Sequence, residues 1–240
     1  MQCLILAGGL GTRMKPETDH FPKALLPVCG MPFAFHQLSW LAQYGVTEVV
    51  YSIGYKGQMI QNYVGTGEQW GLSVKYVDEG TELKGTGGAV RFAHDQGVLN
   101  SEFLLTYGDS FLPIDFSEVW KHFQAEQRPA LMTVLKNEGA WDASNVIFED
   151  QKIVLYDKTL GNAKPVNMSY IDYGLLGFRR DLIDSAIPRG AKLDLSTFLN
   201  RLSVQSELAG YEVKSRFYEI GSPAGLRDLE LFIEQQRHWA

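Results

Sequence analysis

Apolar residues gather in short runs through the first half of the chain, and segments with apolar residues at helical spacing separate these runs. The runs, at residues 3–7, 48–53, 73–77, 103–107 and 130–135, have the length and composition of buried strands. Helical spacing appears at residues 32–44, 57–63, 87–95 and 116–126. Strands that alternate with single helices form βαβ units. We therefore predict an α/β fold with a Rossmann-like, mostly parallel sheet flanked by helices.

The second half of the chain has a different pattern. Short strand candidates at residues 145–149, 152–157 and 171–178 are joined by tight turns, and residues 149–152 suit a hairpin. Helical patterns return at residues 181–186, at 194–205 and from Pro223. No Pro-, Gly- or Ser-rich linker separates the halves. We predict one domain over residues 1–240: a first half at 1–135, an antiparallel second half at 136–222 that covers a crevice, and a C-terminal helix at 223–240.

Composition removes several classes of protein. The formal net charge of −6 gives no electrostatic footprint for a nucleic-acid partner. No apolar run approaches the roughly 18 residues of a membrane helix. Only two cysteines, Cys3 and Cys29, are present, which is no disulfide framework, and we interpret both as buried small residues. We expect a cytoplasmic protein without a membrane partner.

The segment after the first predicted strand carries the clearest chemistry. Gly8, Gly9 and Gly11 allow backbone N–H groups to turn outward and cradle an anion, and the cations Arg13 and Lys23 follow. Two solvated surface charges are the plainer interpretation of this pair. A dinucleotide site is disfavoured because Met14 stands where a small residue is needed, and residues 26–30 lack the acidic residue that binds a ribose. The Gly-Lys-Ser/Thr ending of a Walker loop is also absent.

This stretch resembles the signature of the sugar-1-phosphate nucleotidylyltransferases, whose fold is of the GT-A-like type. The match runs through Leu6, Ala7, Gly8, Gly9, Leu10, Gly11, Thr12 and Arg13, then Pro16, Thr18, Pro22 and Lys23. Further landmarks follow in the family's order over nearly the whole chain. Within the family, the chain looks most similar to the short enzymes that activate heptose-1-phosphate with GTP or N-acetylmuramate-1-phosphate with UTP.

The resemblance implies a reaction and roles for the first residues. A sugar-1-phosphate oxygen attacks the α-phosphorus of a nucleoside triphosphate in line, and pyrophosphate leaves. Arg13 would hold the β- and γ-phosphates, and Lys23 would lie nearer the α-phosphate. The other nucleotide-binding positions implied are Leu6, Ala7, Gly8, Gly9, Gly11 and Thr12, with Gly85, Thr86, Gly87 and Gly88 at the nucleobase. Thr86 also suits a helix N-cap, and this motif does not name the base.

Two carboxylates are metal candidates. Asp109 follows an apolar strand beside the glycine loop, where a carboxylate is well placed to hold Mg²⁺, although a turn or cap aspartate would have the same sequence. The resemblance makes Asp109 the metal ligand and gives Glu219 as its partner, in a motif whose usual acidic residue is one methylene shorter. Ser222 and Pro223 then suit the N-cap and first position of a last helix.

The acceptor site is implied by two further matches. Lys158 would bind the phosphate of the sugar-1-phosphate and Asp157 a sugar hydroxyl, in a segment where aspartate and threonine replace the family's glutamate and proline. Asp172 and Asn145 are candidates for hydroxyl contacts, and Gly174 would let the sugar approach the backbone. Without the resemblance, an Asp-Lys pair in a hairpin is a surface feature.

Our leading hypothesis is a Mg²⁺-dependent enzyme that makes an NDP-sugar from an NTP and a sugar-1-phosphate for surface polysaccharide. GTP with a heptose- or mannose-type phosphate is the first expectation, and UTP or dTTP with another sugar is the alternative. A nucleotide-sugar-binding regulator without catalysis is the alternative from a different class. It is disfavoured because Arg13, Lys23, Asp109 and Lys158 are all present. A homo-oligomer is possible.

Overall fold

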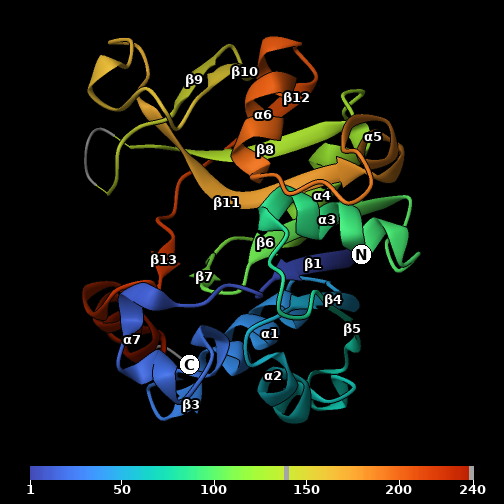
Figure 1. Ribbon diagram of the computed structural model, residues 1–240. Helices are drawn as coiled ribbons and strands as arrows, with labels where there is room; N and C mark the ends of the chain where they lie inside the picture. The colour runs from blue at the N-terminus through green and yellow to red at the C-terminus, as the bar shows by residue number, and fades with distance from the viewer. Residues whose placement is uncertain (138–140, 238–240) are drawn as a thin grey trace.

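Strands form at the apolar runs and pair into one mixed sheet. The structure is a computed structural model that describes residues 1–137 and 141–237. Within these residues the main sheet has nine strands in the order β5-β4-β1-β6-β11-β8-β12-β10-β9 (Figure 1). The strands are β1 (Gln2–Leu6), β4 (Glu48–Ile53), β5 (Ser73–Asp78), β6 (Glu102–Tyr107), β8 (Ala130–Lys136), β9 (Val146–Glu149), β10 (Lys152–Tyr156), β11 (Tyr170–Arg179) and β12 (Leu208–Val213).

The predicted α/β architecture is confirmed. Strands β5, β4, β1 and β6 are parallel neighbours, as the βαβ pattern predicts. On the other side of β6 the sheet becomes largely antiparallel: β11 runs against both β6 and β8, and β9 and β10 form the expected hairpin. Its turn places Asp150 and Gln151 at positive φ, which suits a two-residue hairpin turn.

The order of strands in the sheet differs from their order in the sequence where the two halves of the chain meet and interleave. The run at residues 130–135 is the fifth strand candidate of the alternating pattern in the first half. In the sheet, β11, from the second half, lies between β6 and β8. Strand β12, which the apolar pattern did not predict, pairs in parallel with β8. The two halves of the chain therefore share one continuous sheet.

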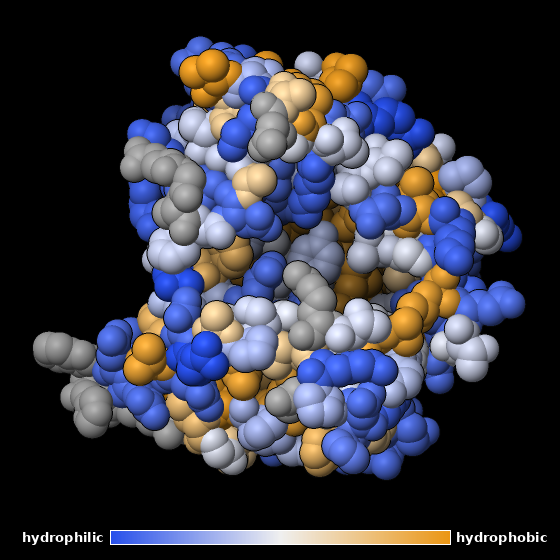
Figure 2. Space-filling view, turned by 60° about the vertical axis from the view of Figure 1, so that its left-hand side comes forward, coloured by the Kyte–Doolittle hydropathy of each residue, from blue (hydrophilic) through white to orange (hydrophobic). Residues whose placement is uncertain are grey.

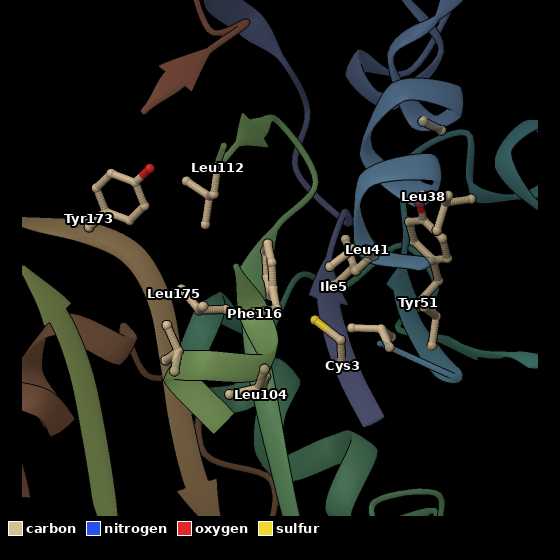
Figure 3. Packing of buried hydrophobic residues seen from close by; sticks show 14 of the residues in the cluster. Cys3, Ile5, Leu38, Leu41, Tyr51, Leu104, Leu112, Phe116, Tyr173 and Leu175 are labelled. Atoms are coloured by element: carbon tan, nitrogen blue, oxygen red, sulfur yellow. The ribbon is translucent and has the colours of Figure 1, made fainter. Parts of the chain in front are cut away.

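Helices cover both faces of this sheet because the strands carry apolar side chains on both faces. One face holds α1 (Phe33–Gln43), α2 (Gly57–Val64) and α4 (Phe116–Ala125), whose buried residues share one apolar cluster with Cys3 and Ile5 of β1. The other face holds α3 (Gly85–Asp95), α5 (Arg180–Ala186) and α6 (Leu195–Val204), which pack in the cluster around Leu4. Figure 3 shows the first cluster, in which Leu41 of α1 lies near Ile5 of β1 and Leu38 lies near Tyr51 of β4.

The last helix returns to the N-terminal half. Helix α7 (Pro223–Arg237) begins with Pro223 at its first position, and the Ser222 hydroxyl accepts a hydrogen bond from Gly225 N at 3.1 Å, so the predicted cap is present. The helix packs with the hairpin of β2 (Pro27–Val28) and β3 (Met31–Pro32), as Figure 1 shows. No helix among the described residues is long and apolar enough to cross a lipid bilayer.

Candidate active site

The glycine loop lies at the carboxyl ends of the parallel strands. Ala7 N donates to Ser52 O of β4 at 2.8 Å, and Gly108 N donates to Leu6 O at 2.9 Å, so the ends of three strands are joined. A Cβ on Gly108 would stand 2.7 Å from Ala7 Cβ, which explains why glycine is needed for this close approach. Gly9 is exposed, and no atom lies within 4 Å of the place where its Cβ would be. The loop therefore has open space where an anion would approach.

The chain turns from this loop into a short 3-10 helix. Gly11 has φ +66°, and its carbonyl accepts hydrogen bonds from Met14 N at 2.9 Å and from the Thr18 hydroxyl at 2.9 Å. Thr12 is exposed at the first position of that helix, Thr12–Met14. The backbone of Arg13 belongs to the same helix, while its side chain lies outside the described part of the chain.

Lys23 and Asp109 form an ion pair beside the glycine loop. Lys23 Nζ lies 2.6 Å from Asp109 Oδ2, and the side chains are 18% exposed for Lys23 and 27% exposed for Asp109. Asp109 stands in the turn between β6 and the short strand β7 (Ser110–Phe111). A tertiary contact over 86 positions thus joins two residues that the sequence only suggested would share a site.

A two-stranded ribbon brings Glu219 to the same place. Strand β13 (Tyr218–Glu219) runs against β7, with Glu219 opposite Ser110, and Ile220 N donates to Asp109 O at 3.0 Å. Two carboxylate residues thus lie side by side at the crevice. No group of three or more His, Cys, Asp or Glu side chains with metal-binding geometry occurs within the described ranges. A metal ion here would take its remaining ligands from phosphates and water, which is how Mg²⁺ usually binds.

The acceptor candidates line one cavity of about 650 Å³. Of the predicted residues, Asn145, Asp157, Lys158, Asp172 and Glu219 contribute to its wall. Figure 2 shows the molecule hollowed between its two sides, with hydrophilic residues around the opening. Gly174 is elsewhere: it has φ +97° at a register shift in β11, and its N–H donates to Asp172 Oδ1 at 3.0 Å.

Lys158 forms an ion pair with a buried carboxylate. Its Nζ is 3.5 Å from Asp172 Oδ2, and the Asp172 side chain is only 3% exposed. Asn145 Oδ1 accepts a hydrogen bond from Asp172 N at 2.9 Å, so Asn145 fixes the strand that carries this carboxylate. Burial, and then the negative charge of Asp172, raise the pKa of the Tyr156 hydroxyl far above its ordinary value, so Tyr156 stays a neutral donor to Asp172.

The departure from the family's Glu-Lys-Pro segment has a local explanation. Asp157 Oδ1 accepts hydrogen bonds from Thr159 N at 2.7 Å and from the Thr159 hydroxyl at 2.6 Å. A proline at position 159 has no N–H to give. Aspartate and threonine together thus form the turn that presents Lys158.

The predicted nucleobase motif lies at the start of α3, against a segment from the second half. Gly87 N and Gly88 N both donate to Leu193 O, at 2.9 and 3.2 Å. Thr86 does not cap α3; its hydroxyl accepts a hydrogen bond from Leu195 N, at the start of α6, at 2.7 Å. A Cβ on Gly88 would lie 2.4 Å from Ala191 O, so these glycines are required by close backbone packing.

Sequence reasoning missed Glu79 in the same region. Its Oε1 accepts a hydrogen bond from the Ser52 hydroxyl at 2.9 Å, and its Oε2 accepts one from Lys84 N at 3.3 Å. A Cβ on Gly8 would stand 2.9 Å from Glu79 Oε1, so this carboxylate borders the glycine loop. The available signal was its position directly after β5, at the same edge of the sheet as the loop.

The fold is that of solved sugar nucleotidyltransferases. A structure described as a putative glucose-1-phosphate thymidylyltransferase from Bacillus anthracis has a TM-score of 0.83 at 21% identity, over 97% of this chain and 94% of the other. HddC from Yersinia pseudotuberculosis has a TM-score of 0.79 at 20% identity, over 97% and 99%. At this level of identity the likeness shows the fold alone.

The sequence comparison then gives the family. The pattern of the nucleotidyl transferase family matches residues 2–144, and the chain belongs to that family. The predicted family resemblance is thereby confirmed.

Named relatives are similar at low identity. A mannose-1-phosphate guanylyltransferase of Mycobacterium tuberculosis is 27% identical over 93% of this chain, which spans 62% of that protein's length. A D-glycero-alpha-D-manno-heptose 1-phosphate guanylyltransferase of Aneurinibacillus thermoaerophilus is 26% identical over 95% of this chain and 96% of its own.

Proposed function

We propose that the protein transfers a nucleotidyl group from an NTP to a sugar-1-phosphate and releases pyrophosphate. The observation that carries this proposal is the pairing of β7 with β13. It brings Glu219, which lines the acceptor cavity, beside Asp109, which is paired with Lys23 next to the glycine loop. A phosphate-binding loop and an acceptor cavity thus meet at one pair of carboxylates, as a reaction between two phosphate-bearing substrates requires.

In this reaction the chain positions two anions and offsets their charge. The backbone N–H groups of the glycine loop and Arg13 hold the β- and γ-phosphates, and Lys23 moves from Asp109 to the α-phosphate. Lys158, presented by Asp157 and Asp172, holds the sugar phosphate whose oxygen attacks the α-phosphorus in line. Asp109 and Glu219 would hold Mg²⁺. When bound, the ion supplies positive charge to the phosphates.

GTP is the proposed donor. Each Glu79 oxygen accepts one hydrogen bond within the chain and retains a second lone pair, and Oε1 borders the loop. Guanine carries adjacent N1–H and N2–H donors that a carboxylate can accept. Uracil and thymine present oxygen acceptors on both sides of their single N–H, which a carboxylate repels. The names of the mannose- and heptose-1-phosphate guanylyltransferase relatives support the same base. A heptose- or mannose-type phosphate is therefore the proposed acceptor, with the product used for surface polysaccharide and the reaction in the cytoplasm, where NTPs are made.

A matrix of five NTPs and a panel of sugar-1-phosphates, with pyrophosphate release as the readout, tests this function. We expect turnover with Mg²⁺ and the highest kcat/KM for GTP with a heptose- or mannose-1-phosphate. Highest turnover with UTP or dTTP would overturn the base assignment. Binding of a nucleotide sugar without pyrophosphate release from any pair would identify a non-catalytic binder.

A substitution at Glu79 tests the assignment of guanine as the base. Glu79→Gln should lower the preference for GTP over UTP at least tenfold, because an amide presents one acceptor and one donor instead of two acceptors. Glu82→Gln, an exposed carboxylate in the same loop, is the matched control and should leave the preference unchanged. An unchanged preference in Glu79→Gln would remove Glu79 from the nucleobase site.

A further inference from the structure

A second cation lies in the wall of the acceptor cavity and has no role in the chemistry above. Arg216 lies between β12 and β13, and its guanidinium carbon is 4.0 Å from the ring centre of Trp141 and 4.4 Å from that of Tyr218. The side chain is 32% exposed and, like Trp141, lines the cavity. Two aromatic rings thus hold the guanidinium plane in place, which lowers the entropy that it loses on binding a ligand.

The hydrogen bonds of Arg216 leave part of its fork available. Nη2 donates to Asp228 Oδ2 of α7 at 3.0 Å, and Nε donates to Phe217 O at 3.4 Å. A guanidinium has five N–H donors, so two bonds do not exhaust them. Asp228 also lines the cavity, so its carboxylate lies beside these donors. The wall therefore offers a donor and an acceptor next to each other.

That combination matches a hydroxyl group, which both donates and accepts. The charge of the cavity argues against a second anion on the sugar. Among the described residues, its wall carries two cations, Lys158 and Arg216, and one of them is needed for the phosphate. The same described residues include five carboxylates, those of Asp142, Asp157, Asp172, Glu219 and Asp228. The cavity, at about 650 Å³, is also ample for a small ligand.

We propose that Arg216, held between Trp141 and Tyr218 and paired with Asp228, is a specificity-determining residue that binds the exocyclic hydroxyl groups of the acceptor sugar. The acceptors it selects are neutral sugar-1-phosphates with a hydroxylated chain on the ring, such as a heptose, over 6-deoxyhexoses and pentoses. This inference rests on the proposed function, because it takes the cavity as the site of the sugar-1-phosphate.

The test measures acceptor binding by calorimetry and turnover by pyrophosphate release, with heptose-1-phosphate, mannose-1-phosphate and 6-deoxymannose-1-phosphate. We expect wild type to bind the 6-deoxy sugar at least tenfold more weakly than the better of the other two. Arg216→Gln should weaken binding of the hydroxylated sugars to the level of the 6-deoxy sugar, and should leave the 6-deoxy sugar and the NTP unaffected. Lys214→Gln removes a cation that is 81% exposed and outside the cavity wall, and it should change nothing.

The outcomes separate this inference from the proposed function. Discrimination that persists in Arg216→Gln, or an equal loss for all three sugars, overturns the role of Arg216. If wild type discriminates and Arg216→Gln does not, the inference stands even where no pyrophosphate is released, and only the proposed catalysis fails. If no sugar-1-phosphate binds to wild type, both this inference and the proposed function are wrong. Arg216→Lys, which keeps the charge but not the planar fork, serves as the second variant if Arg216→Gln does not fold, and it too should lose the discrimination.

Discussion

At the scale of single residues, the ion pair of Lys23 and Asp109 is the feature with the most consequences. The two charged atoms are 2.6 Å apart, and each side chain is partly shielded from water. Each therefore offsets the cost of holding the other in the crevice before substrates arrive. A phosphate gives Lys23 a competing partner and leaves Asp109 available to a cation, so the pair suits a site that is stable when empty and changes partners when it binds.

We predict that Asp109→Asn keeps the fold and lowers kcat by two or more orders of magnitude. Loss of charge neutralisation at reacting phosphates commonly costs about 3 kcal/mol or more. Steady-state kinetics at saturating Mg²⁺ measures the loss, and circular dichroism checks the fold. Glu219→Gln should have a smaller effect, because its longer side chain ligates less rigidly. Near-normal activity of Asp109→Asn would exclude Asp109 from the metal site.

Lys23→Ala should mainly lower kcat and leave the KM for the NTP nearly unchanged. Its charge is proposed to act on the α-phosphate as charge develops there, and such an interaction is stronger in the transition state than in the ground state. Initial rates over a range of NTP concentrations separate the two constants. A raised KM with unchanged kcat would contradict this assignment.

Lys158→Ala should raise the KM for the sugar-1-phosphate at least tenfold, which is about 1.4 kcal/mol of lost charge-assisted binding. Its Nζ lies over the buried Asp172, so the change also leaves that carboxylate without its cation. Calorimetry of NTP binding is the control and should show little change. A mutant that loses NTP affinity but keeps its sugar-phosphate KM would place Lys158 on the wrong substrate.

Individual site residues could be predicted only where the sequence places them in a recognisable local pattern. Asp109 and the glycines follow apolar strands, and Lys158 lies in a motif, so these positions could be proposed from the chain alone. Glu79 and Arg216 could not, because each becomes a candidate only through neighbours that are distant in sequence. Glu79 contacts Ser52 and borders Gly8, and Arg216 lies between Trp141 and Tyr218.

At the scale of elements, periodicity located most helices and strands but not how they pair. Strand β12 was missed because its first residues, Leu208, Ala209 and Gly210, do not alternate between apolar and polar side chains. Two of them, alanine and glycine, are also uncommon in strands. A Cβ on Gly210 would lie 2.4 Å from Phe148 Cε2, so packing against the β9–β10 hairpin favours glycine over a strand former. The insertion of β11 beside β6 likewise depends on tertiary pairing that no local pattern encodes.

The start of α3 gives a prediction at this scale. Gly88→Ala should lower the free energy of unfolding by about 1–3 kcal/mol, although alanine is the better helix former, because the new Cβ would lie 2.4 Å from Ala191 O. Urea denaturation of the ligand-free protein measures the change. Gly9→Ala is the matched control and should be neutral, since no atom lies within 4 Å of its Cβ position. Equal or greater stability of Gly88→Ala would contradict the close packing of α3 on the loop before α6.

At the scale of the whole molecule, the C-terminal helix α7 follows the residues of the acceptor cavity in sequence and packs against the N-terminal half of the chain. Ile220, Leu229 and Ile233 form a separate apolar cluster with Met14, Leu26, Val28, Phe33 and Phe111. Met14 ends the short helix that follows the glycine loop, and Phe111 follows Ser110 in β7. This cluster therefore packs against both the segment that follows the glycine loop and the β7–β13 ribbon.

Leu229→Ala should consequently affect both stability and nucleotide binding. Leu229 is 0% exposed, and its truncation should lower the free energy of unfolding by about 2–5 kcal/mol, as for other buried leucines. Because the cluster includes Met14, the KM for the NTP should also rise, while the Kd for the sugar-1-phosphate changes less. Leu231→Ala, two positions along α7 and 58% exposed, is the matched control and should stay within about 0.5 kcal/mol of wild type. Denaturant unfolding and initial rates measure the two effects, and a stable Leu229→Ala variant with normal NTP kinetics would show that α7 does not support the nucleotide side.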